Sequence, residues 1–352
     1  MIDWTKSMSQ TFEYYTVDPR TWSDVEPIRT VKTCQISRDE SAETLGSASI
    51  TITDMVGETY IRAYLVAVQN GVKYKVALGT FLIQTPSSKF DGRIRDVTVD
   101  AYTPLLELKE SPPPIGYSLF KGANIIDSAY DICLDHARAP ISKGNCETEL
   151  QTDFVANTND TWLTFLTDLI ANANHKFDLD EMGRIMFAPK QDTASLQPVW
   201  TYDDGNSSIL YPEVTLDHDL YGIPNVVEVI YSTGVNSYSA RIVNDDPNSP
   251  ISTVNRGREI IYRETDPKIA GNPNEEQVVE YATQLLRDLS TLEYTISYTH
   301  GYCPVRVGDC VRFDYSRAGL NSIKGRVVSQ TIECKPGCKV TEKAVFTNKL
   351  WR

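Results

Sequence analysis

The sequence predicts a mainly β protein with an α+β insert, and three observations support this fold class. Tyr is more frequent than Phe (19 against 10), and Thr, Val and Ile recur in short runs, which is a composition that favours strands. Apolar and polar side chains alternate in the first hundred residues and again after residue 213. Between these two regions the apolar residues follow a helical period.

The first β-rich region, residues 1–110, is predicted to be a run of hairpins. Asn70-Gly71 joins two of its strands, because both central residues of a two-residue hairpin turn need positive φ. Asp91-Gly92 marks a second turn. A run of hairpins without a helix predicts an antiparallel barrel or sandwich. The expected strands are 47–53, 60–68, 73–78, 79–84 and 94–102.

An α+β insert is predicted for residues 111–204. It begins at the three prolines from Pro112 onward, since a run of prolines cannot lie inside a helix or a sheet ladder. One helix is expected at 122–136, and a second is expected to start at an Asn159-Asp160 cap. Residues 176–187 predict a short hairpin with Gly183 at its turn.

The chain from residue 205 onward, including a second β-rich region at 236–352, returns to strands. Residues 243–256 are predicted to be a loop, and a helix at about 275–291 has an acidic first turn that suits the helix dipole. Lys335-Pro336-Gly337-Cys338 has the residues of a type II turn, and whether Cys334 and Cys338 pair across it is left open. The expected strands are 213–232, 260–262, 294–298, 310–315, 324–332 and 339–346.

Composition and charge exclude several classes of protein. The net charge of −13 argues against a nucleic-acid binder held by phosphate contacts, because such domains are basic. No run of 18 apolar residues is present, so no membrane-spanning segment is predicted, and the N-terminus shows no signal-peptide pattern. The seven scattered cysteines are an odd number and are expected to be reduced thiols.

The sequence contains no P-loop, zinc-protease or nucleophile-elbow motif. Asp217-His218-Asp219 could be drawn as a general base with its orienting acid. Neighbouring side chains on a strand point to opposite faces, however, so a solvated loop histidine is the preferred interpretation. No histidine has another histidine three or four residues away; the four are His136, His175, His218 and His300.

Acidic and thiol groups also fall short of known sites. Asp178, Asp180 and Gly183 match the start of a calcium loop, but Met182 and Pro189 occupy two of its ligand positions, so a polar hairpin tip is preferred. The spacing of Cys303, Cys310, Cys334 and Cys338 is not that of a zinc site, and Asp203-Asp204 and Asp245-Asp246 are expected in loops. We therefore predict no catalytic residue, no cofactor, no cofactor-binding residue and no metal ligand.

Five segments in order carry a family resemblance. They are 46–52; 78–83 with 97–106; 161–166 with 174–185; 223–229; and 282–286 leading to Pro304-Val305-Arg306-Val307-Gly308-Asp309-Cys310-Val311. Together they resemble the baseplate hub or tail-tip hub proteins of tailed bacteriophages and contractile injection systems. The last piece is the most specific, whereas Thr103 stands where the family usually has Asp.

The resemblance implies two tube-type antiparallel β-barrels, residues 1–110 and 236–352, flanking the α+β insert, with strands in 205–235 completing the first barrel. It implies a homotrimeric ring in the virion, made in the host cytoplasm, that continues the tail tube. The implied partners are the tail tube protein, distal tail or baseplate proteins, tip, spike or fibre proteins, and the tape-measure protein in the lumen. DNA would pass through without specific binding. The chain ends at Arg352 without a segment resembling a hydrolase, so no enzymatic domain is expected.

Alternative functions remain open at this point. One is another ring of the same tail, of the distal tail type; others are an enzyme or a carbohydrate-binding β protein that uses Tyr and Trp as stacking platforms. The net charge motivates the hypothesis of an acidic lumen that repels DNA. Residues 335–352 carry five basic side chains against one acidic, which indicates a solvated edge or a contact with an acidic neighbouring subunit.

Overall fold

The computed structural model describes residues 2–53, 57–90, 92–93, 95–191, 193–232, 237–265, 267, 269 and 274–351. The chain divides into two compact units. The first contains Met1–Val214 with Tyr298–Ala344, and the second contains Thr215–Ser297 with Val345–Arg352. These units do not coincide with the predicted ranges 1–110, 111–204 and 236–352. The predicted fold class, mainly β with an α+β insert, is confirmed.

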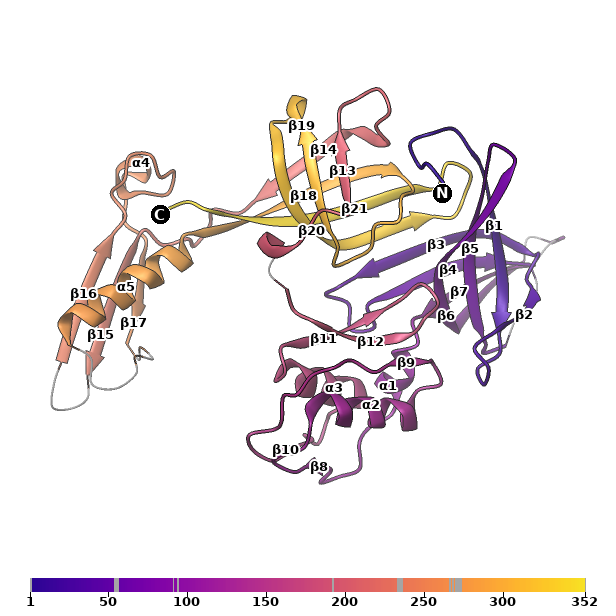
Figure 1. Ribbon diagram of the computed structural model, residues 1–352, viewed down its shortest axis with the longest axis horizontal. Helices are drawn as coiled ribbons and strands as arrows, with labels where there is room; N and C mark the ends of the chain where they lie inside the picture. The colour runs from indigo at the N-terminus through magenta and orange to yellow at the C-terminus, as the bar shows by residue number, and fades with distance from the viewer. Residues whose placement is uncertain are drawn as a thin grey trace. The chain divides into compact units, whose positions relative to one another are not determined.

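Antiparallel pairing dominates the large sheet (Figure 1). Its strands are β1 (Ser9–Val17), β2 (Asp24–Pro27), β3 (Val31–Asp39), β4 (Gly46–Ile52), β5 (Tyr60–Gln69), β6 (Val72–Phe90), β7 (Arg95–Tyr102), β13 (Trp200–Asp203), β14 (Leu210–His218), β18 (Thr291–Gly301), β19 (Cys310–Tyr315), β20 (Leu320–Glu333) and β21 (Lys339–Lys349). In the described part of the chain these 13 strands follow the order β14-β18-β21-β20-β3-β4-β7-β6-β5-β1-β2, with β13 and β19 off this path.

The hairpin predicted at Asn70-Gly71 is confirmed between β5 and β6, with φ of 52° and 78° at the two turn residues. The prediction of separate strands at 73–78 and 79–84 is wrong, because β6 continues past Gly79. The ring of Phe81 lies over Gly79, so closely that a Cβ there would be 2.5 Å from the ring, and the β5–β6 register shifts nearby. A bulge therefore takes the place of the expected break.

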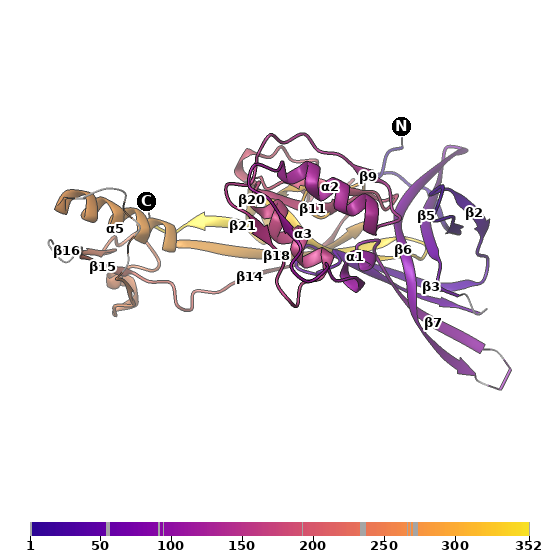
Figure 2. The ribbon, with the colours of Figure 1, turned by 90° about the horizontal axis from the view of Figure 1, so that it is seen from below.

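The far ends of β6 and β7 run together as a two-stranded ribbon (Figure 2). The strand expected at 94–102 is confirmed as β7 from Arg95 onward. Ile94, and Asp91 of the turn predicted at Asp91-Gly92, lie outside the described residues.

Distant parts of the sequence meet in the first unit, where β20 pairs antiparallel with β3. Ile332 of β20 thereby enters the same apolar core as Ile36 of β3 and Ile50 of β4. Strands within 205–235 were expected to complete the first barrel, and one of them, β14, belongs to the large sheet that contains β3 and β4. β14 pairs with β18, and β15 (Val226–Ser232) pairs with β16 (Ser237–Val243) and β17 (Ile261–Glu264).

The insert of the first unit packs three helices against short strands (Figure 1). Its elements are α1 (Leu106–Glu110), β8 (Ser118–Leu119), α2 (Ile125–His136), β9 (Ile141–Ser142), β10 (Phe154–Val155), α3 (Trp162–Ala171), β11 (His175–Leu179), β12 (Ile185–Pro189) and the 3₁₀ turn η1 (Thr193–Ser195). Leu105 and Leu108 already belong to its core, so that core begins before the three prolines.

Helix caps explain where the insert helices start. The helix predicted at 122–136 is confirmed as α2, whose N-cap Asn124 accepts a hydrogen bond from a backbone N–H of the first turn. The Asn159-Asp160 cap is wrong: Thr161 caps α3 and forms a capping box with Thr164. Asp160 instead accepts the backbone N–H of Asn157, so it closes the preceding turn.

The second unit contains the sheet β16-β15-β17, with α5 (Glu275–Leu289) packed on it. One face of α5, with Val278, Ala282 and Leu286, packs against Val227 and Val229 of β15. The helix predicted at about 275–291 is thus confirmed. The prediction of a loop throughout 243–256 is wrong in part, because the short helix α4 (Thr253–Arg256) forms there behind its N-cap Ser252.

The type II turn predicted at Lys335–Cys338 is confirmed by a φ of 93° at Gly337 and by a hydrogen bond from the Cys338 N–H to the Lys335 carbonyl. The 3₁₀ turn η2 (Ser316–Ala318) precedes β20. Within the described ranges, no helix combines the length and the apolar character that a membrane crossing needs.

Candidate functional site

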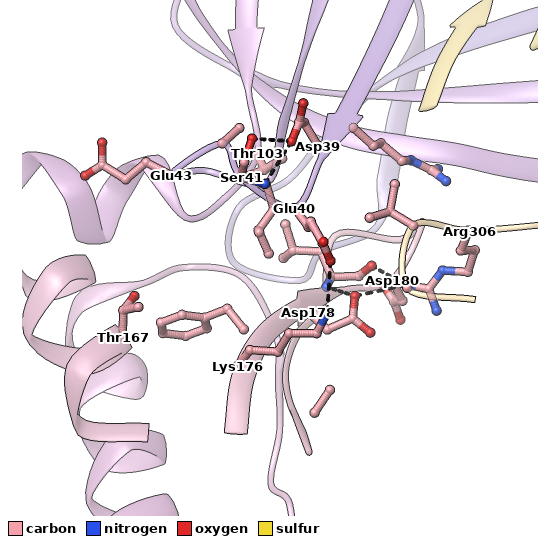
Figure 3. Close-up of a pocket in the computed structure, with 18 of the residues that line it drawn as sticks. Asp39, Glu40, Ser41, Glu43, Thr103, Thr167, Lys176, Asp178, Asp180 and Arg306 are labelled. Carbon is pink, nitrogen blue, oxygen red and sulfur yellow. Dashed lines mark hydrogen bonds and ion pairs between the residues drawn. The ribbon is translucent and has the colours of Figure 1, made fainter. Parts of the chain in front are cut away.

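A cavity of about 1070 Å³ lies in the first unit, where the insert meets the sheet (Figure 3). Three segments supply most of its polar lining: the loop after β3, the β11–β12 hairpin and the turn before β19. Figure 3 shows Glu40, Asp178, Asp180 and Arg306 gathered where these segments approach each other. Side chains of both charges therefore face each other across the junction.

Arg306 connects the turn before β19 to the insert hairpin. Its Nε lies 2.8 Å from Oε1 of Glu181, and its Nη2 lies 3.6 Å from Oδ1 of Asp178 and donates to the Leu179 carbonyl. Nη1 of Arg38, from β3, lies 3.5 Å from the same Glu181 oxygen. Two guanidinium groups, one on β3 and one in the turn before β19, thus hold one glutamate of the hairpin.

The turn that carries Arg306 is built by the motif 304–311. Asp309 accepts the backbone N–H of Arg306 at 2.8 Å, and Gly308 adopts a φ of 97°. Burial raises the pKa of Asp309, while the Arg306 N–H and the Arg306 charge act in the opposite direction. The motif therefore fixes the position of Arg306.

The hairpin tip also approaches the sheet closely. Gly183 adopts a φ of 79°, and a Cβ there would lie 2.8 Å from the Cβ of Thr80 on β6. Trp22 donates its indole N–H to the Met182 carbonyl at 2.7 Å, and the almost fully buried Arg62 donates to the same carbonyl at 3.2 Å. Glycine is thus required by both the backbone conformation and the space.

Glu40 completes the junction from the β3 side. Arg326 of β20 donates to both of its carboxylate oxygens, and Lys176 of β11 lies 3.5 Å from one of them. Glu40, Asp178 and Glu181 each face a cation, and Asp309 accepts a backbone N–H. Acids neutralised in this way are arranged to hold segments together rather than to move protons.

A second polar cluster lies inside the first unit around Glu342 of β21. Its Oε2 lies 3.2 Å from Nε2 of His300 and accepts the Tyr298 hydroxyl at 2.5 Å, and its Oε1 accepts a hydrogen bond from Gln330 at 2.5 Å. The Tyr202 hydroxyl lies 3.1 Å from the same His300 nitrogen. Glu342, His300 and Gln330 are 1%, 0% and 1% exposed, so this cluster is shielded from solvent.

The two charges of this cluster stabilise each other. Burial lowers the pKa of His300, but hydrogen bonds to Cys303 and Glu342 and the Glu342 charge outweigh burial and raise it to about 10. Burial raises the pKa of Glu342, but the His300 hydrogen bond and charge outweigh burial and lower it. At neutral pH the pair is therefore ionised, and it is a buried salt bridge.

The candidate base Asp217-His218-Asp219 does not form a dyad. His218 ends β14 and lies with its ring 5.1 Å from the ring of Tyr294. Asp219 accepts the backbone N–H of Tyr221, which is a loop interaction. Elsewhere, His136 stacks on Trp162, and His175 contacts a backbone carbonyl.

The remaining sequence candidates are also accounted for by local structure. The hairpin interpretation of 176–187 is confirmed, with Asp180 accepting the Arg184 N–H in the turn. Asp246 accepts the Asn248 N–H in a turn, as expected. Asp203 was expected in a loop but is the last residue of β13, where it accepts the Gly205 N–H. Among the residues that the structure describes, no three His, Cys, Asp or Glu side chains are arranged to hold a metal ion.

The candidate zinc cysteines separate into different surroundings. Cys303 lies beside His300 and Tyr202 in the buried cluster. Cys334 and Cys338 instead pack into the apolar core with Cys34. All seven cysteines are free thiols in the structure.

Sequence reasoning missed the buried charges. Val340, Glu342 and Ala344 lie on the same buried face of β21, so the charge of Glu342 stands between two apolar residues. Arg62 likewise lies among mostly apolar residues of β5. A charged residue at an inward position of an alternating strand was the available signal. Its partners lie on other strands, and nothing in the local sequence points to them.

No family model matches this sequence. No curated protein matches it either.

Solved structures do match the fold. The tail protein from Neisseria meningitidis MC58 aligns with a TM-score of 0.59 at 13% identity, covering 96% of this chain and 97% of that one. The 43 kDa tail protein of prophage MuSo2 from Shewanella oneidensis aligns with a TM-score of 0.63 at 11% identity, over 96% and 98%. The chain therefore has the fold of these two tail proteins.

A secretion-system component has a similar fold. The Escherichia coli c3393 protein is described as a component of the type VI secretion system with structural similarity to the T4 bacteriophage tail proteins gp27 and gp5. It aligns with a TM-score of 0.51 at 8% identity, over 92% of this chain and 75% of that one. The tail-protein fold expected from the resemblance is thus confirmed.

Proposed function

We propose that this chain is a structural protein of a bacteriophage tail, the central hub of the tail tip or baseplate. The observation that carries the proposal is the end-to-end match to two phage tail proteins, which covers 96% of this chain and at least 97% of each of them. An alignment of this extent includes the insert as well as the sheet, so the whole architecture is shared. The charged cavity is consistent with a structural role, because the carboxylates that join its segments are paired.

In this proposal three copies form a ring that continues the tail tube and joins it to a tip or spike. Two tube-type barrels per chain would adapt a six-fold tube to a three-fold tip. A closed ring requires one heterologous interface repeated by rotation, which also covers sheet edges that would otherwise aggregate. The partners would be the tail tube protein, distal tail or baseplate proteins, tip or fibre proteins and the tape-measure protein.

The net charge of −13 supports a lumen through which DNA passes without binding. A negative wall repels phosphates, which is the reverse of binding by counterion release. An assembled ring whose lumen surface is neutral or basic would contradict this part of the proposal.

The oligomeric state of the purified chain tests the proposal. Sedimentation velocity and native mass spectrometry over a hundredfold concentration range should show a trimer of the 39.5 kDa chain, or a trimer formed on adding a tail tube protein. Mass action predicts that the trimer fraction rises with concentration. A chain that stays monomeric under all these conditions, and binds a glycan, would favour the carbohydrate-binding alternative instead.

A further inference from the structure

Two cysteines stand opposite each other where distant parts of the sequence meet. The β3–β20 register runs from Ser329 opposite Asp39 to Glu333 opposite Gln35. One further step places Cys334 opposite Cys34, and the Cys334 N–H donates to the Cys34 carbonyl at 3.0 Å. The pairing of the two strands therefore continues through the two cysteines.

The separation of directly opposed residues suits a disulfide. Opposed Cα atoms in a hydrogen-bonded antiparallel pair lie about 5.5 Å apart, and disulfides span Cα separations of about 4.4–6.8 Å. Opposed side chains leave the sheet on the same face. Both thiols accordingly contact one apolar core, where Cys34 is 6% exposed and Cys334 is partly buried.

The surroundings of the thiols agree with this placement. A hydrogen bond with Cys34 is the largest cause that raises the pKa of Cys334, followed by burial. Burial, followed by the charges of these same two cysteines, raises the pKa of the Tyr14 hydroxyl. The Tyr14 hydroxyl and the two thiols therefore lie close together. The charge of Cys338 also raises the pKa of Cys334, but it is a smaller cause than the hydrogen bond with Cys34.

We propose that Cys34 and Cys334 form a disulfide that links β3 to β20 when the protein reacts with a small-molecule disulfide. In the reaction a thiolate of the pair attacks the reagent and displaces one reduced thiol. The second cysteine then attacks the mixed disulfide and displaces the other. One Sγ–Sγ bond forms, the two cysteines lose two electrons and two protons, and the reagent is reduced to two thiols.

Such a disulfide would stabilise the protein mainly because it closes a long loop in the unfolded chain. About 300 residues separate Cys34 from Cys334 in the sequence. In the chain-entropy description, a loop of that length removes more freedom from the unfolded chain than a short one does. We expect the oxidised protein to unfold at a temperature roughly 5–10 °C above that of the reduced protein.

Refolding the full chain from urea in a buffer of oxidised and reduced glutathione tests the proposal at equilibrium. Non-reducing peptide mapping should find residues 33–38 linked to residues 327–339. Lys335 precedes Pro336, so trypsin leaves Cys334 and Cys338 in the same peptide. The Cys338→Ser variant therefore assigns the bond, because it should keep the link and the raised unfolding temperature.

Cys34→Ser should lose both the link and the difference between oxidised and reduced unfolding temperatures. Circular dichroism under reducing conditions serves to confirm that each variant is folded. If Cys34→Ser does not fold, the mapping of wild type and Cys338→Ser still decides the question. A bond between Cys334 and Cys338, or free thiols at Cys34 and Cys334 in the refolded wild type, would overturn the proposal.

Discussion

Replacing Glu342 by Gln tests how much the buried pair contributes to the stability of the first unit. The substitution keeps the shape of the side chain and an oxygen that can accept the Tyr298 hydroxyl, but removes the charge that faces His300 at 3.2 Å. His300 would then lie in an apolar interior without a counterion. We expect it to become neutral, because burial acts against its charged form.

The magnitude follows from the pKa of His300. The folded value is about 10 and the reference value is 6.5, so the charged form is favoured by about 5 kcal/mol of differential interaction below pH 6.5. Because the pKa is raised on folding, this contribution is complete below pH 6.5 and is lost as the pH rises through about 10. Removing the buried Glu342 charge also removes its desolvation cost, so we expect a net loss of about 3 kcal/mol at pH 7.

Urea unfolding followed by tryptophan fluorescence at pH 6, 7.5 and 9 measures this effect. The wild-type protein should lose stability steadily over that range, and Glu342→Gln should show a much flatter dependence. Glu293→Gln makes the same chemical change at an exposed position of β18 and should stay within about 0.5 kcal/mol of wild type. A Glu342→Gln protein that is less than 1 kcal/mol destabilised, or that keeps the wild-type pH slope, would refute the reasoning.

Two further predictions concern the junction between insert and sheet. Gly183→Ala should lower the free energy of unfolding by about 2–4 kcal/mol, since its Cβ would lie 2.8 Å from Thr80, whereas Gly116→Ala, with the same φ of 79° but open space, should cost only about 1 kcal/mol. Equal losses of unfolding free energy for the two variants would show that the close approach of Gly183 to Thr80 does not contribute to stability. Arg306→Ala should speed tryptic cleavage between the insert and the sheet severalfold, and the exposed Arg317→Ala should not; identical cleavage rates would contradict the role given to Arg306.

Local chemistry allowed much of the fold to be predicted. Asn70-Gly71 and Pro336-Gly337 supplied turn residues whose backbone angles only a few residues adopt, and both turns formed. The position of α5 followed from its apolar stripe and its acidic first turn. These signals lie within a few residues of the structure that they specify, and so the sequence contains them directly.

Pairing between distant strands could not be predicted in the same way. β20 alternates like the other strands, so the local pattern did not indicate that it would pair with β3. The choice depends on which apolar face fits: Ile332 joins the core around Ile36, while Val227 and Val229 are covered by α5. That complementarity is a property of the packed molecule.

The junction and the buried cluster are linked through one side chain, Arg38, a connection that the local sequence does not indicate. Arg38 of β3 lies 3.5 Å from Glu181 of the insert hairpin and donates to Gln330 of β20 at 3.0 Å, and Gln330 donates to Glu342. No residue of this chain of contacts indicates its partners from the neighbouring sequence. Together they run from the insert to the interior of the sheet, so the hairpin position and the buried charge are held by the same arginine. Such a connection favours a rigid first unit.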